Sequence, residues 1–287
     1  MAKHQIDDEI QNVYSLRDIV DSYEKISATK MQNIRSSVLL NREFLESLNH
    51  VFQQVKKSYQ SELKNLMKKE NISGNKFSLI KTNGKTLYVL LSANTGLYGD
   101  ILRKTYDLFK TYALKEKGDI MIIGKLGQDM FSRDNYNRQF IHRDLGDANI
   151  VADELKDVAN LIIQYERVIV FHGKFQTTVS QIPTATSVSG DPLPGEEPAA
   201  NIKFFFEPSL EEIMLFFEKE IFTSYFEQTV QESQLAKHAS RMISLDSSLE
   251  NIKKNLEILF SEQRRQSHID MNKKQLETIS SIKLWKK

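Results

Sequence analysis

Glycine and proline are missing from both ends of this chain. All 11 glycines and all 5 prolines lie between Gly74 and Pro208. Glycine costs a helix interior roughly 1 kcal/mol and proline roughly 3 kcal/mol relative to alanine, and both residues mark loops. Residues 1–73 and 209–287 can therefore each form one uninterrupted helix. The sequence predicts two long terminal helices around a central domain at 74–208.

The sequence also has no cysteine, a small net charge and no long apolar run. With 0 cysteines the chain cannot form disulfides or thiolate metal sites, which suits a reducing compartment. Its 39 Lys and Arg against 38 Asp and Glu leave a net charge of +1, so nucleic-acid binding is not indicated. No run approaches the roughly 18 apolar residues of a membrane helix, and the acidic start is unlike a signal peptide. A cytoplasmic protein with no direct membrane insertion is expected.

Apolar residues recur at heptad spacing in the carboxyl-terminal segment. The a and d positions of four heptads are Leu235, His238, Met242, Leu245, Leu249, Ile252, Leu256 and Leu259. Because only His238 among them is polar, the pattern predicts a coiled-coil seam. The seam is interrupted at Gln263 and Gln266 and is expected to resume out of phase at Ile269, Leu276 and Ile279.

The amino-terminal segment carries a second seam that could pair with the first. Its positions are Ile34, Val38, Asn41, Leu45, Leu48, Phe52, Val55, Tyr59, Glu62 and Leu66, and an apolar face continues upstream through Ile6, Ile10, Val13, Leu16 and Val20. At 1.5 Å per residue either helix could reach roughly 100 Å. Antiparallel pairing would give a shaft with the globular domain attached at its base. Ordinary packing in a helical bundle is the alternative.

The central domain has strand and helix patterns in alternation. Short apolar runs at 87–91, 120–123 and 168–171 predict buried strands, and 97–114 and 147–163 predict helices. This order is typical of a mostly parallel sheet, so the predicted fold is α/β: a long antiparallel coiled coil plus a central Rossmann-like domain. Residues 175–182 and 202–206 are predicted as strands flanking a proline-rich loop at 184–201.

Enzyme motifs in this domain are incomplete. The turn Ser-Ala-Asn-Thr-Gly-Leu-Tyr-Gly at 92–99 has G-x-x-G but not the G-x-G-x-x-G of a dinucleotide-binding loop, so it lacks the glycine that lets the backbone approach a pyrophosphate. Asn-Gly-Lys-Thr at 83–86 resembles the end of a phosphate loop, but a strand follows where a helix is needed. His-Arg-Asp-Leu at 142–145 with Asn149 has the spacing of a kinase catalytic loop, without the glycine-rich loop or metal site of a kinase. No catalytic residue, cofactor or metal site is predicted.

Histidine spacing gives no metal motif either. The six histidines are scattered and include no H-E-x-x-H pattern: His4, His50, His142, His172, His238 and His268. His238 is interpreted as a polar member of the coiled-coil seam.

The carboxyl-terminal half contains Phe-Glu-Pro-Ser-Leu-Glu-Glu-Ile at 206–213, Glu-Ser at 232–233, His-Ala-Ser-Arg-Met at 238–242, and Arg-Gln at 265–266. In order and spacing these motifs closely resemble the gamma subunit of rotary F-type ATP synthases. That family reads approximately FEPS-x-E-E, then ES-x-x-S-E-H-A-A-R-M, then a late RQ-x-x-I-T. Elsewhere Lys-Ile-Ser at 25–27 with Met31 resembles K-I-T-x-A-M, and the turn at 92–99 resembles S-D-R-G-L-C-G. Ala93 and Thr95 replace the Asp and Arg of that turn.

The resemblance implies a rotor that does no chemistry itself. In that family the terminal helices insert into a hexamer of alternating alpha and beta subunits, and the α/β domain contacts the epsilon subunit and the membrane ring. It makes Arg241, Arg265 and Gln266 candidates for contacts with the hexamer, against the alternative of a solvated helix face. Met31 and Met242 are candidates for packing within the shaft.

The sequence leaves three other functions open. A gamma-like shaft could drive a load other than protons, such as motility machinery, without the membrane ring. A static coiled-coil scaffold would not activate alpha and beta subunits. A small-molecule enzyme would bind a nucleotide. The rotor interpretation places the protein at the inner face of the cell membrane, held there through its complex.

Overall fold

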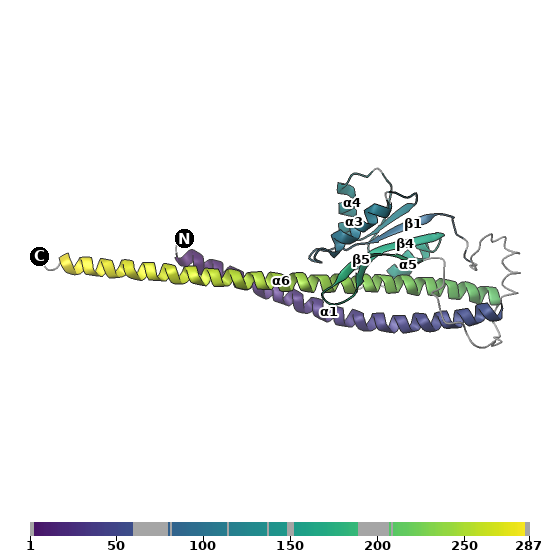
Figure 1. The fold of residues 1–287 in the computed structure, drawn as a ribbon, viewed down its shortest axis with the longest axis horizontal. Coiled ribbons are helices and arrows are strands. Elements are labelled where there is room, and N and C mark those ends of the chain that lie inside the picture. The colour runs from purple at the N-terminus through teal and green to yellow at the C-terminus, as the bar shows by residue number, and fades with distance from the viewer. Residues whose placement is uncertain are drawn as a thin grey trace. The chain divides into compact units, whose positions relative to one another are not determined.

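The computed structural model describes residues 3–59, 80, 82–113, 115–136, 138–147, 152–188, 207 and 209–284. Two long helices are its main elements, α1 at Lys3–Ser58 and α6 at Leu210–Leu284 (Figure 1). The chain divides into two compact units. The smaller contains residues 1–29 and 241–287, and the larger contains residues 30–240, so each long helix contributes to both units.

The start of α6 is fixed by its own sequence. Ser209 immediately precedes the helix, and its Oγ accepts a hydrogen bond from the backbone N–H of Glu212 at 3.2 Å. This contact satisfies one of the free N–H groups of the first turn. Glu211 and Glu212 also place negative charge at the positive end of the helix dipole.

In the smaller unit α1 and α6 pack as an antiparallel pair. Ile6 and Ile10 form a buried cluster with Leu256 and Leu259. At one edge of this cluster the rings of Tyr14 and Phe260 meet edge-to-face, with centroids 6.3 Å apart. The heptad prediction is therefore confirmed for this part of the seam.

The interruption of the heptad pattern has a specific partner. Gln263 Nε2 donates to Asp7 Oδ1 at 2.6 Å, so a polar contact replaces the expected apolar one. The predicted return of the seam beyond it is wrong, because Ile269, Leu276 and Ile279 are about half exposed or more. The reason is the position of α1, which begins at Lys3, beside this level of α6. Leu16, predicted on the buried face of α1, is also exposed.

In the larger unit the same two helices pair again. Phe52 and Val55 of α1 are buried with Met214 of α6, and the rings of Phe52 and Phe217 lie 6.2 Å apart. Arg42 and Glu232 form an ion pair at 3.5 Å. The numbering runs in opposite directions along these contacts, so the pairing is antiparallel here as well. Glu62 and Leu66 of the predicted seam lie outside the described residues.

The larger unit also contains a five-stranded sheet. Its strands are β1 (Thr86–Leu91), β2 (Asp119–Ile123), β3 (Ile141–Arg143), β4 (Arg167–Phe175) and β5 (Gln181–Ser187), in the spatial order β3-β2-β1-β4-β5. β1 to β4 pair in parallel and β5 is antiparallel to β4. The other helices are α3 (Ile101–Ala113), α4 (Lys125–Arg133) and α5 (Ala152–Ile162).

Each face of the sheet has its own core. Tyr88 and Leu90 of β1 are buried with Phe109 of α3 and Phe131 of α4. The alternate residues of the same strand are buried on the other face with α5 and α6, because successive side chains of a strand point to opposite faces. Phe226 of α6 is fully buried in this second core. The helix that pairs with α1 is thus also a layer of the α/β domain.

The three main strand predictions are confirmed, and both predicted helices are present with shorter bounds. The prediction of a strand at 175–182 is wrong, because β4 ends at Phe175 and a turn precedes β5. β5 includes residues 184–187, so the predicted proline-rich loop 184–201 begins later than expected. Residues 189–201 of that loop and the predicted strand 202–206 lie outside the described residues. The short elements β3 and α4 were not predicted.

His172 is a buried polar residue at the junction of β4 and β5. Its Nε2 lies 2.9 Å from Thr186 Oγ1 and its Nδ1 lies 3.1 Å from the carbonyl oxygen of Gly173. The carbonyl can only accept, so Nδ1 carries the proton and Nε2 accepts from Thr186. Burial lowers the pKa of His172 to about 4, against the opposing effect of the Gly173 bond.

Protonation of His172 should make stability depend on pH. The unfolded chain protonates this histidine near pH 6.5 and the folded chain only near pH 4, so the free energy of unfolding should fall as pH drops between these values. We expect a loss of about 2 kcal/mol by pH 5 from this group. Urea unfolding at pH 7 and pH 5 should show a smaller pH effect in His172→Gln than in the parent. His268→Gln, on an exposed site, is the control, and equal pH effects in all three proteins would contradict the expectation.

The shared core of sheet and helix should be sensitive to the size of Phe226. Phe226→Ala should lower the free energy of unfolding of the larger unit by about 3 to 5 kcal/mol, because it leaves a cavity in a fully buried position. Phe216→Ala, at a position of the same helix that is 60% exposed, should cost less than about 1 kcal/mol. Urea denaturation followed by circular dichroism measures both variants, and similar losses would show that α6 is not part of the core.

The helix pair of the smaller unit can be tested in the same way. Leu259→Ala should destabilise this unit by about 2 to 4 kcal/mol, since Leu259 is buried against Ile6 and Ile10. The adjacent Ile258→Ala should have little effect because Ile258 is 58% exposed. Amide hydrogen exchange of residues 3–14 reports this loss directly. Unchanged exchange in Leu259→Ala would mean that the two helices do not depend on each other there.

Candidate functional site

The turn after β1 is held by one carboxylate. Asp147 accepts hydrogen bonds from the backbone N–H groups of Asn94 and Thr95, each at 2.8 Å from Oδ2, and from Thr95 Oγ1 at 2.9 Å. Three donors on a single carboxylate fix both the turn and the loop that carries Asp147. These bonds therefore hold the turn predicted at 92–99 in a defined conformation.

Asn94 joins the same turn to two further loops. Its side-chain oxygen accepts from the backbone N–H of Lys125 at 2.9 Å, and its Nδ2 donates to the carbonyl of Leu145 at 3.0 Å. Lys125 begins α4 after β2, and Leu145 follows β3. The carboxyl ends of three adjacent strands are thereby tied together.

Side chains of α6 close this edge of the sheet. Lys237 is 8% exposed, and its Nζ donates to the carbonyl of Ser92 at 2.9 Å. Gln234 donates from Nε2 to the carbonyl of Asp147 at 3.4 Å. A small cavity of about 20 Å³ lies between these residues and the strand ends. Open α/β sheets bind ligands at this edge, so α6 occupies the place that a nucleotide would take.

The backbones of α6 and the turn approach each other closely. Gly99 has a φ of 61°, and a Cβ there would lie 2.6 Å from Ser240 Oγ. Glycine is required by both the conformation and the space. The rings of Tyr98 and His238 meet edge-to-face at 5.9 Å. His238 therefore contacts the α/β domain, in addition to its predicted place in the seam.

Residues 233–240 of α6 are all buried. A helix in a pair normally leaves one face in water, so eight consecutive buried residues mean that this stretch is surrounded. Its small residues, such as Ala236 and Ala239, allow the neighbours to come close. Gly173 of β4 is one of them, since a Cβ there would lie 3.3 Å from that of Ala236.

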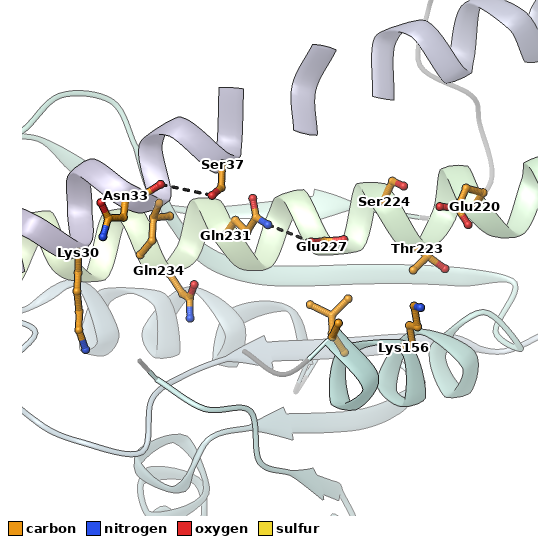
Figure 2. A pocket seen from close by; sticks show the side chains of 13 residues that line it. Lys30, Asn33, Ser37, Lys156, Glu220, Thr223, Ser224, Glu227, Gln231 and Gln234 are labelled. Atoms are coloured by element: carbon orange, nitrogen blue, oxygen red, sulfur yellow. Dashed lines mark hydrogen bonds between the residues drawn. The ribbon is translucent and has the colours of Figure 1, made fainter. Parts of the chain in front are cut away.

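A cleft of about 460 Å³ lies between α1, α5 and α6 (Figure 2). Lys30 projects from α1 and Lys156 from α5, while Glu220 and Glu227 lie on α6. Gln231 donates to Glu227 Oε1 at 3.1 Å along the helix. The lining carries two cations and two anions, with amides and hydroxyls between them, so it does not favour a ligand of one charge.

The predicted contact residues are spread along the long helices. Arg265 is exposed on α6, and Gln266 is half-buried and donates to Asp270 Oδ1 at 3.3 Å. Arg241, Met242 and Met31 are each half-buried. Arg241 and Arg265 are 24 positions apart on one helix, about 36 Å at 1.5 Å per residue, so they do not form one site.

The described residues of the kinase-like spacing lie in and just after the edge strand β3. His142 and Arg143 form part of the edge strand β3, and His142 Nε2 lies 3.6 Å from Asp144 Oδ1. Asn149 lies outside the described residues. In the described part of the chain, no group of three histidine, cysteine, aspartate or glutamate side chains could hold a metal ion.

Sequence reasoning missed Asp147 and Lys237. Neither belongs to a motif that carries chemistry, and Lys237 lies outside the a and d positions of the heptads. The only available signal was the concentration of small residues at Ser233, Ala236, Ala239 and Ser240, which indicates close approach of another backbone.

None of the described helices combines the length and the apolar character needed to cross a bilayer.

Comparison with known proteins gives consistent results. Curated relatives include the ATP synthase gamma chains of Flavobacterium johnsoniae, 23% identical over 257 residues and 86% of each chain, and of Cytophaga hutchinsonii, 24% identical over 286 residues and 96% of each chain. Among solved structures, a chain from the central stalk and c-ring structure of the Tetrahymena thermophila mitochondrial ATP synthase aligns with a TM-score of 0.56 at 18% identity, covering 80% of this chain and 99% of that one.

A chain of the Euglena gracilis mitochondrial ATP synthase aligns with a TM-score of 0.51 at 14% identity, covering 86% of this chain and 94% of that one. These structural alignments support the fold of paired terminal helices with a central α/β domain. A sequence model of the family described as ATP synthase matches residues 2–272. Since this match spans nearly the whole chain, the protein belongs to the ATP synthase family.

Proposed function

We propose that this chain is the central-stalk rotor, the gamma subunit, of an F-type ATP synthase. The observation that carries the proposal is the pair of uninterrupted helices, α1 of 56 residues and α6 of 75 residues, which pack antiparallel. The longer helix, α6, is also a layer of the α/β domain. A continuous hydrogen-bonded helix resists twisting, and rotation of the domain must turn a helix that belongs to its core. Family membership and the gamma-chain relatives support the same function.

The proposed role is mechanical and not catalytic. A shaft inside a hexamer of alpha and beta subunits contacts its open and closed subunits differently. Those differential contacts link rotation to nucleotide occupancy. An epsilon-type subunit and a membrane ring are the proposed partners of the α/β domain. The protein would then lie at the inner face of the membrane, attached through its complex.

Arg241, Arg265 and Gln266 are the proposed contacts with the hexamer, and Met31 and Met242 are proposed to pack within the shaft. The exposure of Arg265 supports its part in this assignment, because a contact residue must be accessible in the isolated chain.

Rotation can be tested by reconstitution with the alpha and beta subunits of the same organism. The chain has 0 cysteines, so Thr111→Cys on an exposed position of α3 gives a unique attachment point for a bead. We expect ATP-dependent rotation in one direction and ATPase activity that requires the chain. ATPase without rotation would support a static scaffold instead. Rotation by a native complex that purifies without a membrane ring would favour a load other than protons.

The proposed contacts can be tested in the same complex. Arg265→Ala combined with Gln266→Ala should lower ATP-driven turnover about tenfold, which corresponds to about 1.4 kcal/mol of lost interaction in the rotating complex. Lys273→Ala, an exposed position on the same helix, is the matched control and should leave turnover unchanged. Equal turnover in the double variant and in Lys273→Ala would mean that Arg265 and Gln266 lie on a solvated helix face and do not contact the hexamer.

A further inference from the structure

Two ionisable side chains bond the turn after β1, Lys237 from α6 and Asp147 from the loop after β3. Lys237 bonds the carbonyl at the start of this turn, Ser92, and Asp147 bonds the backbone N–H groups further along it. Gln234, one helical turn from Lys237, bonds the backbone of Asp147. We call Lys237, Gln234, Asp147 and the turn 92–95 the Asp147–Lys237 clamp.

The clamp differs in kind from the apolar contacts beside it. Phe226 and the other apolar side chains of α6 hold the helix on the sheet, but apolar packing is not directional. Hydrogen bonds to the Lys237 ammonium and the Asp147 carboxylate have fixed lengths and angles, and charged donors and acceptors make the stronger bonds. The apolar core keeps the domain and α6 together, whereas the clamp fixes their angle and register.

Burial makes the clamp costly to break. Lys237 and Gln234 are 8% and 7% exposed, so water cannot easily replace their bonds. Lys237 Nζ also lies 5.9 Å from the centre of the Tyr98 ring. A rotation of the α/β domain against α6 would have to separate a buried ammonium from its acceptor.

The clamp lies where this chain departs from the family pattern. The family motif ES-x-x-S-E-H-A-A-R-M has glutamate at the position of Lys237, and neither the aspartate nor the arginine of S-D-R-G is present in the turn 92–95. The charge on α6 is reversed and both charges on the turn are lost. In this chain the turn is held by Asp147, which belongs to a different loop.

We infer that Lys237 and Asp147 are positioning residues that lock the α/β domain onto α6, so that torque passes between them without slippage. The inference rests on the proposed rotor function for its mechanical part. Its structural part, a fixed angle between domain and helix, concerns the larger unit alone.

The structural part can be measured on the full chain. Spin labels at Thr111→Cys on α3 and Lys219→Cys on α6 would report one distance, because the chain has no other cysteine. We expect Lys237→Met and Asp147→Asn to widen the distance distribution about twofold. Lys237→Arg keeps the charge and should stay close to the parent. Lys253→Met, an exposed lysine of the same helix, is the matched control.

The mechanical part needs the complex with alpha and beta subunits. Lys237→Met should lower the torque at which a bead on the α/β domain stalls by about threefold, while unloaded ATP hydrolysis stays within about 1.5-fold of the parent. Loss of the lock affects only work against a load. A merely structural role for Lys237 would lower both quantities together.

Each outcome either supports or overturns the inference that Lys237 and Asp147 lock the α/β domain onto α6. Parent-like distance distributions in both Lys237→Met and Asp147→Asn would overturn the inference, as would parent-like stalling torque. If Lys237→Met does not fold, the comparison of Asp147→Asn with Lys237→Arg carries the same test. If the parent chain fails to rotate at all, the proposed function fails, and the distance measurement still decides whether the clamp exists.

Discussion

The structure depends on α6, which must pack against both α1 and the sheet. Between residues 210 and 240, α6 presents Met214 and Phe217 to α1, and Phe222, Phe226 and Val230 to the sheet. These residues recur around the helix and not along one stripe. Because α6 lacks glycine and proline, neither partner meets a break in it. Loss of the first set of contacts would separate α1 from α6, and loss of the second would separate α6 from the sheet.

The sequence was sufficient for most of the architecture, for reasons that particular residues make clear. The absence of helix breakers predicted α1 and α6, and the heptads predicted their pairing at Leu256 and Leu259. Continuous apolar runs at 87–91 and 168–171 predicted buried parallel strands. The hairpin between β4 and β5 was mislocated, because Gln176 to Ser180 contain no glycine or proline to mark the turn.

The clamp could not be predicted, since its residues are ordinary in sequence. Lys237 occupies a helix position that a simple coiled coil would leave in water, and only the sheet packed over it makes it buried. Asp147 is one of two acidic residues in its loop, and its role appears only when the carboxyl ends of three strands are placed side by side. Likewise, Gln263 weakened the heptad pattern, although its partner Asp7 lies 256 positions away.

The burial of residues 233–240 on every side also restricts which side chains this segment can accept. A side chain enclosed all round must match the volume of each neighbour, so evolutionary drift there is limited by steric fit more than by polarity. The stretch that carries His-Ala-Ser-Arg-Met begins inside this enclosed segment. Overall identity to the gamma chain of Cytophaga hutchinsonii is 24%, and within this stretch His238, Ala239, Arg241 and Met242 match the family motif.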